Sequence, residues 1–294
     1  MTSTALPDSG SSAVAPDRMR CMEIWGGNRA ADKQLEMPGL RGWVYSRPHG
    51  SSVGGGDVYY VSSCASGRIS RVLLADVSGH GDMVSGLAIG LRDLMRKNVN
   101  WIKQTRLVRA MNRQFIELAE QGGFATAVAT TFFAPTRSLS ICNAGHPTPF
   151  LWHRDGGGWT EVAQQASGPG KFTNTPLGVI DQAEYVQVET NLSPGDMVLL
   201  VSDALTDARE EDGRLLGTRG LLEIVRGLSP DDPSTLIPRL LRAIETRHDG
   251  NLSEDDATVL LLQATGTSSR VIDNLRAPLR LLRGVKDSTE ITGP

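Results

Sequence analysis

Hydrophobic residues recur along this chain at two spacings, and each spacing predicts a different kind of element. Short apolar runs bounded by turn residues are typical of buried strands, whereas apolar residues three or four positions apart are typical of amphipathic helices. The helical spacing predicts one helix that begins near Asp82 and others over 104–120, 215–226 and 234–247. The short runs predict strands over 22–25, 41–46, 58–61, 68–76, 127–133, 138–143, 148–152, 185–190, 197–202 and 257–263.

The order of these elements indicates the fold class. Strands come first, two helices follow, then many strands, and then further helices. Because the helices are grouped and do not alternate with strands, antiparallel sheets covered by helix layers are favoured over a doubly wound parallel sheet. We therefore expect an α+β fold. No repeat or linker interrupts residues 21–265, so we predict a single domain there.

Both ends of the chain differ in composition from this domain. Residues 1–20 are rich in Ser, Ala and Pro and have no apolar signal core, which predicts a disordered leader. Residues 266–294 form a C-terminal tail in which Val, Ile and Leu mix with Arg. This mixture suits either a short terminal helix or a segment that binds a partner or a membrane surface. Pro278 interrupts this mixed pattern. A packed or frayed terminal helix that binds no ligand is therefore favoured over a binding segment.

Composition excludes several classes of protein. The 294 residues carry 30 Lys and Arg against 33 Asp and Glu, so the net charge of −3 provides no attraction for nucleic acid or for an anionic membrane. No apolar run approaches the ~18 residues of a membrane span. The three cysteines, Cys21, Cys64 and Cys142, are far apart. Their number and spacing predict buried thiols in a reducing, cytoplasmic compartment and no disulfide framework.

Four carboxylates share a position relative to the predicted strands. Asp57 opens a strand after three glycines, and Asp76 closes the strand that forms a hairpin with it, so both lie at the same edge of an antiparallel sheet. Asp203 closes a later apolar run, and Asp255 opens the last one. A single aspartate at a strand end is usually a turn former that caps backbone amides. Four of them in equivalent places indicate a shared site.

Converging carboxylates repel one another unless a cation neutralises them. No nearby cluster of Lys, Arg or His supplies that charge, and an all-oxygen site without a Cys or His pattern suits Mg²⁺ or Mn²⁺ better than Zn²⁺. One bridging carboxylate with further terminal ones is what a two-metal site needs. Such a site activates water for in-line attack on phosphorus. The residues therefore indicate phosphoryl-ester hydrolysis.

Six motifs in a fixed order extend this indication over most of the chain. Together they resemble the SpoIIE/RsbU branch of the PP2C-like (PPM) metal-dependent serine/threonine phosphatases, and the resemblance covers roughly residues 40–265. The motifs are 55–57 (GGD), 76–81 (DVSGHG), 143–147 (NAGHP), 176–178 (PLG), 202–208 (SDALTDA) and 255–258 (DDAT).

The resemblance implies a fold and a set of residue roles. The fold would be a four-layer α/β/β/α sandwich with two central antiparallel sheets and metals in a cleft at one sheet edge. Asp76 would bridge two Mn²⁺ or Mg²⁺ ions, with the Val77 carbonyl and Asp57 completing the second ion's shell. Asp76 and Asp57 would thus be the catalytic residues. Asp203 and Asp255 would bind the first ion.

Four further residues receive lesser roles from the same resemblance. Asp256 would support the ligands without binding metal, and Asp207 could serve a weaker third ion. His80 and His146 lie in glycine turns. Structural roles are favoured for both over general-acid chemistry, because the metals already activate water.

The chain also departs from the family pattern. Ala204 replaces the usual Gly after Asp203, and its methyl group would crowd a position where close backbone approach is expected. Tyr59 and Tyr60 stand where an Asp often follows the first motif. The motifs fix no phosphate-binding Arg, and Arg47 is the nearest candidate.

The resemblance implies a protein serine/threonine phosphatase that uses a hydroxide bridging two divalent metals. Its substrate would be a phosphorylated bacterial regulatory protein, such as an anti-sigma-factor antagonist. Control by a separate regulatory partner or by homodimerisation is compatible with this. The alternative is a non-catalytic pseudophosphatase module that binds phosphoproteins, and the four intact ligands argue against it. Hydrolysis of small phosphate esters also remains open.

Overall fold

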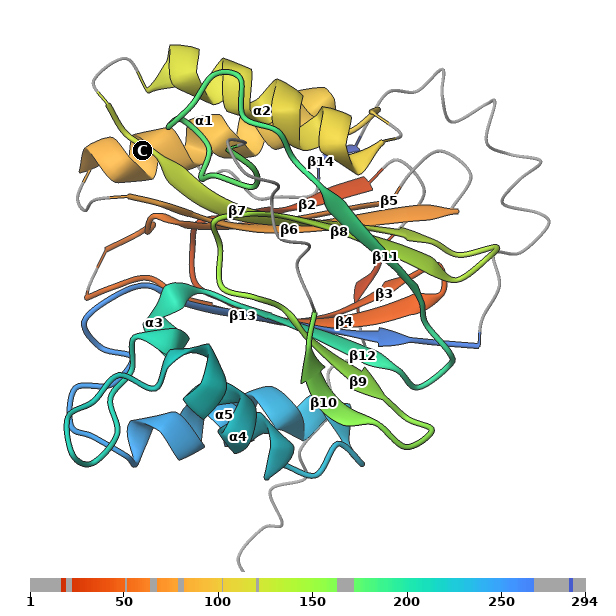
Figure 1. The fold of residues 1–294 in the computed structure, drawn as a ribbon, viewed down its shortest axis with the longest axis vertical. Helices are drawn as coiled ribbons and strands as arrows, with labels where there is room; N and C mark the ends of the chain where they lie inside the picture. Colours follow the sequence, from red (N-terminus) through yellow and green to blue (C-terminus); the bar gives the residue numbers. More distant parts are fainter. Residues whose placement is uncertain are drawn as a thin grey trace, which may run out of the picture.

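The computed structural model describes residues 17–19, 23–50, 52–63, 68–78, 82–101, 103–119, 122–162, 172–266 and 286–287. Two β-sheets lie face to face, and each is covered on its outer side by helices (Figure 1). One outer layer contains α1 (Asp82–Asn98) and α2 (Gln104–Leu118). The other contains α3 (Asp203–Thr206), α4 (Gly217–Arg226) and α5 (Pro233–Glu245). The expected four-layer α/β/β/α sandwich is confirmed.

Each sheet has seven strands and is named here after a central strand. Neighbouring strands are antiparallel except for the two-residue edge strands β1 and β14, which pair in parallel. The β6 sheet has the order β11 (Gln187–Asn191), β8 (Ser138–Ala144), β7 (Ala125–Phe133), β6 (Ile69–Val77), β5 (Asp57–Ser63), β2 (Glu23–Gly27) and β14 (Lys286–Asp287). The β13 sheet has the order β1 (Asp17–Arg18), β3 (Ala31–Met37), β4 (Leu40–Arg47), β13 (Ala257–Ala264), β12 (Met197–Val201), β9 (Phe150–His153) and β10 (Gly158–Glu161).

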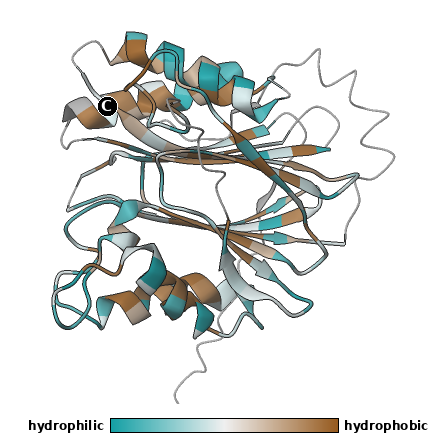
Figure 2. Cartoon of the chain, viewed as in Figure 1, coloured by the Kyte–Doolittle hydropathy of each residue, from teal (hydrophilic) through white to brown (hydrophobic). Residues whose placement is uncertain are grey.

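Burial on both faces explains why the central strands are continuous apolar runs. Successive residues of a strand point to opposite faces. Leu73 therefore packs in the core beneath α1 and α2, whereas Leu74 packs in the core between the two sheets. A third core lies between the β13 sheet and the helices α4 and α5. The helices of both outer layers mix hydrophobic and hydrophilic residues, as amphipathic elements do (Figure 2).

The structure differs from the sequence-based expectation at three places. Strands β3 and β10 were not predicted, because their sequences carry no apolar run. Asp17–Arg18 form β1, and the Met19 amide donates to the Glu36 carbonyl, so part of the predicted leader belongs to the β13 sheet. In the C-terminal tail, Lys286–Asp287 pair with β2 as a strand, and the possible short helix before them lies outside the described residues. The other residues of the leader and tail lie outside the described chain.

Of the helices in the described residues, none has both the length and the apolar character that a membrane crossing demands.

Candidate metal centre

The backbone brings the four aspartates to one end of both sheets. Asp57 opens β5 and faces Asp76 directly in the antiparallel register of β5 and β6. Asp203 begins α3, immediately after β12, and Asp255 lies two residues before β13. Because β12 pairs with β13, the segments that carry Asp203 and Asp255 also lie side by side. In the view of Figure 1 this end of the sheets is at the left, near α3.

The glycines before Asp57 let the backbone approach this cluster closely. A Cβ atom on Gly55 would lie 2.2 Å from the Asp256 Oδ2 atom. A Cβ atom on Gly56 would lie 2.9 Å from the Val77 carbonyl oxygen and 3.3 Å from the Asp76 Oδ1 atom. Any larger residue at Gly55 or Gly56 would enter space that borders these oxygens. The glycine run is therefore part of the site and is more than a flexible approach.

Asp57 is the most deeply buried of the four carboxylates. Neither of its carboxylate oxygens has a hydrogen-bond partner of acceptable geometry. Burial raises the pKa of Asp57 well above its usual range, and the Asp76 charge raises it further. The hydroxyl groups of Thr258 and Ser202 lie near enough to offset part of this rise. A buried carboxylate without partners is costly, and a bound cation would remove that cost.

The other three carboxylates act on one another through space. Burial raises the pKa of Asp76 to about 7, and the charges of Asp203 and Asp255 add to the rise. Burial also raises the pKa of Asp203 to about 6, with contributions from Asp255 and Asp207. The pKa of Asp255 is raised as well, chiefly by burial. Mutual repulsion of this kind shows that the carboxylates share one electrostatic environment.

Asp256 has a different function from its neighbours. Its Oδ2 atom accepts the Gly56 amide at 2.5 Å and the Asp57 amide at 3.3 Å, and its Oδ1 atom accepts the His49 amide at 2.5 Å. Backbone donors therefore engage both oxygens of this carboxylate. Asp256 joins the start of β13 to the approach of β5, and its support of the metal ligands stays a prediction.

The donor set fits a hard divalent cation. It consists of carboxylate oxygens together with the backbone carbonyl of Val77, which are the ligand types that Mg²⁺ and Mn²⁺ prefer. The Asp57 oxygens, which are buried without a hydrogen-bond partner of acceptable geometry, also fit a bound cation. Across the described residues, no three carboxylate, imidazole or thiol side chains already stand close enough to hold one ion between them. The aspartates thus form a cluster and not a closed coordination shell.

Of the two motif histidines, His146 lies within the described residues and His80 does not. His146 is 5% exposed, its Nδ1 atom lies 2.7 Å from the Thr126 hydroxyl, and burial lowers its pKa to about 3. The Asn143 side chain accepts the His146 amide and donates to the His146 carbonyl, both at 2.8 Å. These contacts hold a turn, which agrees with a structural role.

The structure shows the surroundings of two other residues near this site. The Arg47 guanidinium bonds beside α5 to the carboxylate of Glu245 and to the Leu252 carbonyl, and its role as a phosphate ligand stays a prediction. The Ala204 methyl group is buried in the core beneath α4 and α5.

Sequence reasoning missed several residues that shape the site. Thr126 lies opposite Asp76 in the register of β6 and β7, and Asn28 donates to the Gly55 carbonyl at 2.9 Å and to the Ser85 hydroxyl at 3.1 Å. Ser202 and Thr258 lie near Asp57 and bond to each other, with the Thr258 amide donating to the Ser202 hydroxyl at 2.9 Å. Ser202 and Thr258 belong to quoted motifs, but nothing in their spacing indicated a place near Asp57.

Comparisons with known proteins identify the family of this chain and the solved structures that share its fold. The family model of stage II sporulation protein E (SpoIIE) matches residues 66–265, more than half of the chain. The solved RsbU and RsbW domains of a Mycobacterium tuberculosis protein align with a TM-score of 0.62 at 19% identity, covering 83% of this chain and 68% of that one. Among the curated proteins, none matches this chain significantly.

Two further solved structures have the same fold. The PP2C phosphatase domain of Bacillus subtilis SpoIIE, with a fragment of its regulatory domain, aligns with a TM-score of 0.62 at 17% identity and covers 82% of this chain and 62% of that one. The catalytic domain of the serine/threonine phosphatase PstP, in complex with two manganese ions, aligns with a TM-score of 0.51 at 17% identity and covers 77% and 98%. At these identities the alignments show a shared fold.

Proposed function

The chain belongs to the SpoIIE family and has the PP2C-like fold of its RsbU-type branch, and from this premise we propose that it is a metal-dependent protein serine/threonine phosphatase. The observation that carries the proposal is the cluster of Asp57, Asp76, Asp203 and Asp255 at one end of the two sheets. Asp57 within it is buried without a hydrogen-bond partner.

The residues divide into two ligand sets under this proposal. Asp76 would contact both cations, because it faces Asp57 across the strand pair and is coupled electrostatically to Asp203 and Asp255. Asp57 and the Val77 carbonyl would hold one ion, and Asp203 and Asp255 the other. Exposed Asp207, whose charge reaches both Asp203 and Asp255, is the candidate for a weaker third ion.

The chemistry follows from this arrangement. When bound, Mg²⁺ or Mn²⁺ would lower the pKa of a water molecule and neutralise charge on the phosphoryl oxygens. The chain's own contribution is to fix the oxygen donors on β5, β6 and α3. It also keeps the Asp57 carboxylate away from bulk water. In the protein interior the attraction between this carboxylate and a cation is stronger than in water.

We propose a phosphorylated regulatory protein as the substrate, such as an anti-sigma-factor antagonist. Membership of the SpoIIE family supports this class, and one solved relative carries an RsbU domain together with an RsbW domain. The exposed position of Asp255 at the rim of the cluster is compatible with a protein-bound phosphate.

The proposal is tested by hydrolysis of p-nitrophenyl phosphate and of a phosphoserine peptide with and without Mn²⁺. We expect Mn²⁺-dependent turnover of both, and Asp76→Asn should lower kcat by roughly 10³-fold or more because it removes the shared ligand. Asp155→Asn, in the exposed turn between β9 and β10, is the matched control and should leave turnover unchanged. A non-catalytic phosphoprotein-binding module would show no Mn²⁺-dependent turnover, and Asp76→Asn would make no difference.

A further inference from the structure

The two carboxylates of the β13 sheet half, Asp203 and Asp255, are carried by loop segments outside the strands. Asp203 starts the four-residue helix α3, after which the chain runs through a loop that includes Arg209. Asp255 lies at the end of the connection between α5 and β13, four residues after Asn251. Next to the carboxylates, the Ser202 amide donates to the Thr258 carbonyl at 2.9 Å and the Ser202 hydroxyl donates to the Asp256 carbonyl at 3.3 Å, so the two segments are joined on their strand side. On the other side of the carboxylates both segments are loops, and a different contact must join them there.

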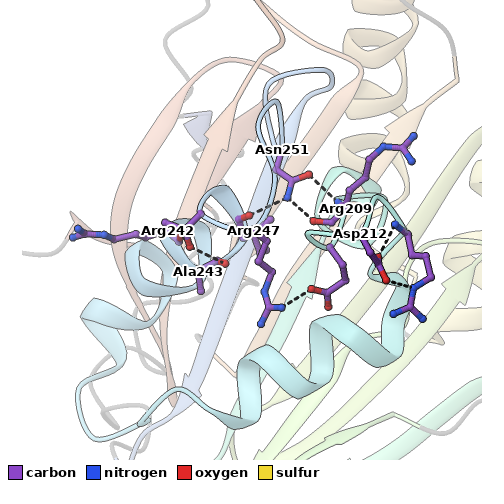
Figure 3. Close-up of polar contacts among 10 residues, drawn as sticks. Arg209, Asp212, Arg242, Ala243, Arg247 and Asn251 are labelled. Carbon is purple, nitrogen blue, oxygen red and sulfur yellow. Dashed lines mark hydrogen bonds and ion pairs between the residues drawn. The ribbon is translucent and has the colours of Figure 1, made fainter.

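The Asn251 side chain joins the same two segments. Its Oδ1 atom accepts the Arg209 amide at 2.8 Å, and its Nδ2 atom donates to the Arg209 carbonyl at 2.9 Å. The same Nδ2 atom donates to the Ile244 carbonyl, near the end of α5, at 2.9 Å. Figure 3 shows Asn251 between Arg209 and the end of α5. One amide therefore holds three backbone groups from two segments.

A second link runs parallel to the first. The Arg247 guanidinium, just beyond α5, forms a 2.5 Å ion pair with the carboxylate of Glu210, the residue after Arg209. On the Asp255 side, the Ser253 amide and hydroxyl both donate to the Gly250 carbonyl, which tightens the turn that follows Asn251. The two segments are thus fixed both to each other and within themselves.

We propose that Asn251 is a positioning residue for the metal centre, which holds the loop side of the Asp203 and Asp255 segments together while the Ser202 bonds hold their strand side. This inference rests on the proposed function. Two carboxylates without a cation repel each other. A link that keeps their loops together therefore lowers the ordering cost that a cation must overcome when it binds.

If Asn251 had a purely structural role, its removal would lower the stability of the fold and leave cation affinity unchanged. Asn251 is only half-buried, and its side-chain bonds go to backbone groups at the edge of the helix layer. The apolar core beneath α4 and α5 packs without it. Removing its amide should therefore alter the loops more than the core, and the change should appear in cation affinity.

The test is calorimetric titration of the metal-free full chain with Mn²⁺, together with turnover as a function of Mn²⁺ concentration. We expect Asn251→Ala to weaken Mn²⁺ binding roughly 10-fold, as loss of an outer support of metal ligands does. Saturating Mn²⁺ should restore kcat to within about 2-fold. Asn251→Gln, which carries the amide one methylene further, should weaken binding in the same direction by less.

The matched control is Asn98→Ala. Asn98 is a buried asparagine whose Nδ2 atom donates to the Leu94 carbonyl at 2.9 Å and to the Gln114 Oε1 atom at 3.1 Å, and whose Oδ1 atom accepts from Trp101 and Gln114. It ends the 17-residue helix α1, about 24 Å of helix from the end next to the site. This variant should lower the melting temperature without changing Mn²⁺ affinity.

Three outcomes would overturn the inference. If Asn251→Ala and Asn251→Gln bind Mn²⁺ as tightly as the wild type, which itself binds and turns over, the positioning role is wrong and the proposed function stands. If both variants lose kcat irrecoverably at saturating Mn²⁺ while folded, the effect of Asn251 is not on cation binding and the positioning role is wrong. If the wild-type chain neither binds Mn²⁺ nor hydrolyses phosphate esters, the proposed function fails and this inference fails with it.

Discussion

The two halves of the candidate centre fix their carboxylates by different means. In the β6 sheet half, Asp57 and Asp76 lie on adjacent strands, directly opposite in register, so the hydrogen-bond ladder sets their separation. In the β13 sheet half, Asp203 and Asp255 lie on loop segments that side chains such as Asn251 tie together. In the first half Asp57 is buried and Asp76 is half-buried, whereas in the second Asp203 is half-buried and Asp255 is exposed. The free-energy cost of burying charged carboxylates is therefore greatest in the first half. The separation of the carboxylates depends on loop contacts mainly in the second half.

This difference makes the stability of the metal-free protein a way to separate the halves. Asp57→Asn removes a buried charge that has no hydrogen-bond partner, so we expect it to raise the free energy of unfolding by ~1–3 kcal/mol without metal. Asp203→Ala should raise it by less, because Asp203 keeps contact with water. Both variants should lose turnover by roughly 10³-fold or more, since each removes a proposed ligand. Urea unfolding and Mn²⁺-dependent hydrolysis measure the two effects.

The comparison breaks if the order of stabilities is reversed. A large destabilisation by Asp203→Ala without metal would show that Asp203 holds the fold through contacts other than its charge. A destabilisation by Asp57→Asn would show that the carboxylate has a partner in solution that offsets its burial.

The pH dependence of the free energy of unfolding should also differ between the two halves. The pKa of Asp76 rises to about 7 and that of Asp203 to about 6, from a usual value near 3.8, so the folded state holds these protons more tightly than the unfolded state. Stability of the metal-free protein should therefore fall as the pH rises from ~4 through ~7 and level off above, by at most ~4 kcal/mol for Asp76. Residual water around Asp76 reduces this figure. Mn²⁺ should abolish the fall, because it binds the deprotonated carboxylates.

Thermal melts at several pH values test this in variants of each half. Asp76→Asn should flatten the pH profile of the metal-free protein more than Asp203→Asn, because the pKa of Asp76 is displaced further. Equal flattening by the two variants would remove the proposed difference between the halves. A metal-free profile that rises with pH would contradict the shifts themselves.

The sequence alone predicts the strands that carry these carboxylates, because both faces of β6, β12 and β13 are buried and leave continuous apolar runs. It also predicts that Asp57 and Asp76 meet, because a hairpin fixes its own register. Strands β3 and β10 escape prediction because their residues are mostly polar or partly exposed, so pairing with a neighbouring strand and not hydrophobicity defines them.

The supports of the site are harder to predict than its ligands. Asn251, Asn28 and Thr126 act through backbone groups or through residues far away in the chain, and hydrogen bonds of that kind leave no periodic trace in a sequence. The environment of Arg47 shows the same limit. The sequence makes Arg47 the nearest candidate for a phosphate ligand, whereas in the structure its guanidinium bonds to Glu245 and to the Leu252 carbonyl.

The smallest expected effect concerns the joint between the two halves. The Asp256 carboxylate, on the β13 side, accepts the Gly56 amide just before β5 and the His49 amide just after β4, and these bonds prevent it from moving aside. A Cβ atom on Gly55 would lie 2.2 Å from the Asp256 Oδ2 atom, so Gly55→Ala must separate the halves or break these bonds. We expect a loss of ~1–3 kcal/mol in the free energy of unfolding and weaker Mn²⁺ binding.

Gly86→Ala is the matched control in the exposed interior of α1, where nothing lies within 4 Å of the added Cβ atom, and it should instead stabilise the protein by ~0.5–1 kcal/mol. If Gly55→Ala leaves both stability and Mn²⁺ affinity unchanged, the Asp256 joint is loose, and the two halves of the centre are not coupled through it.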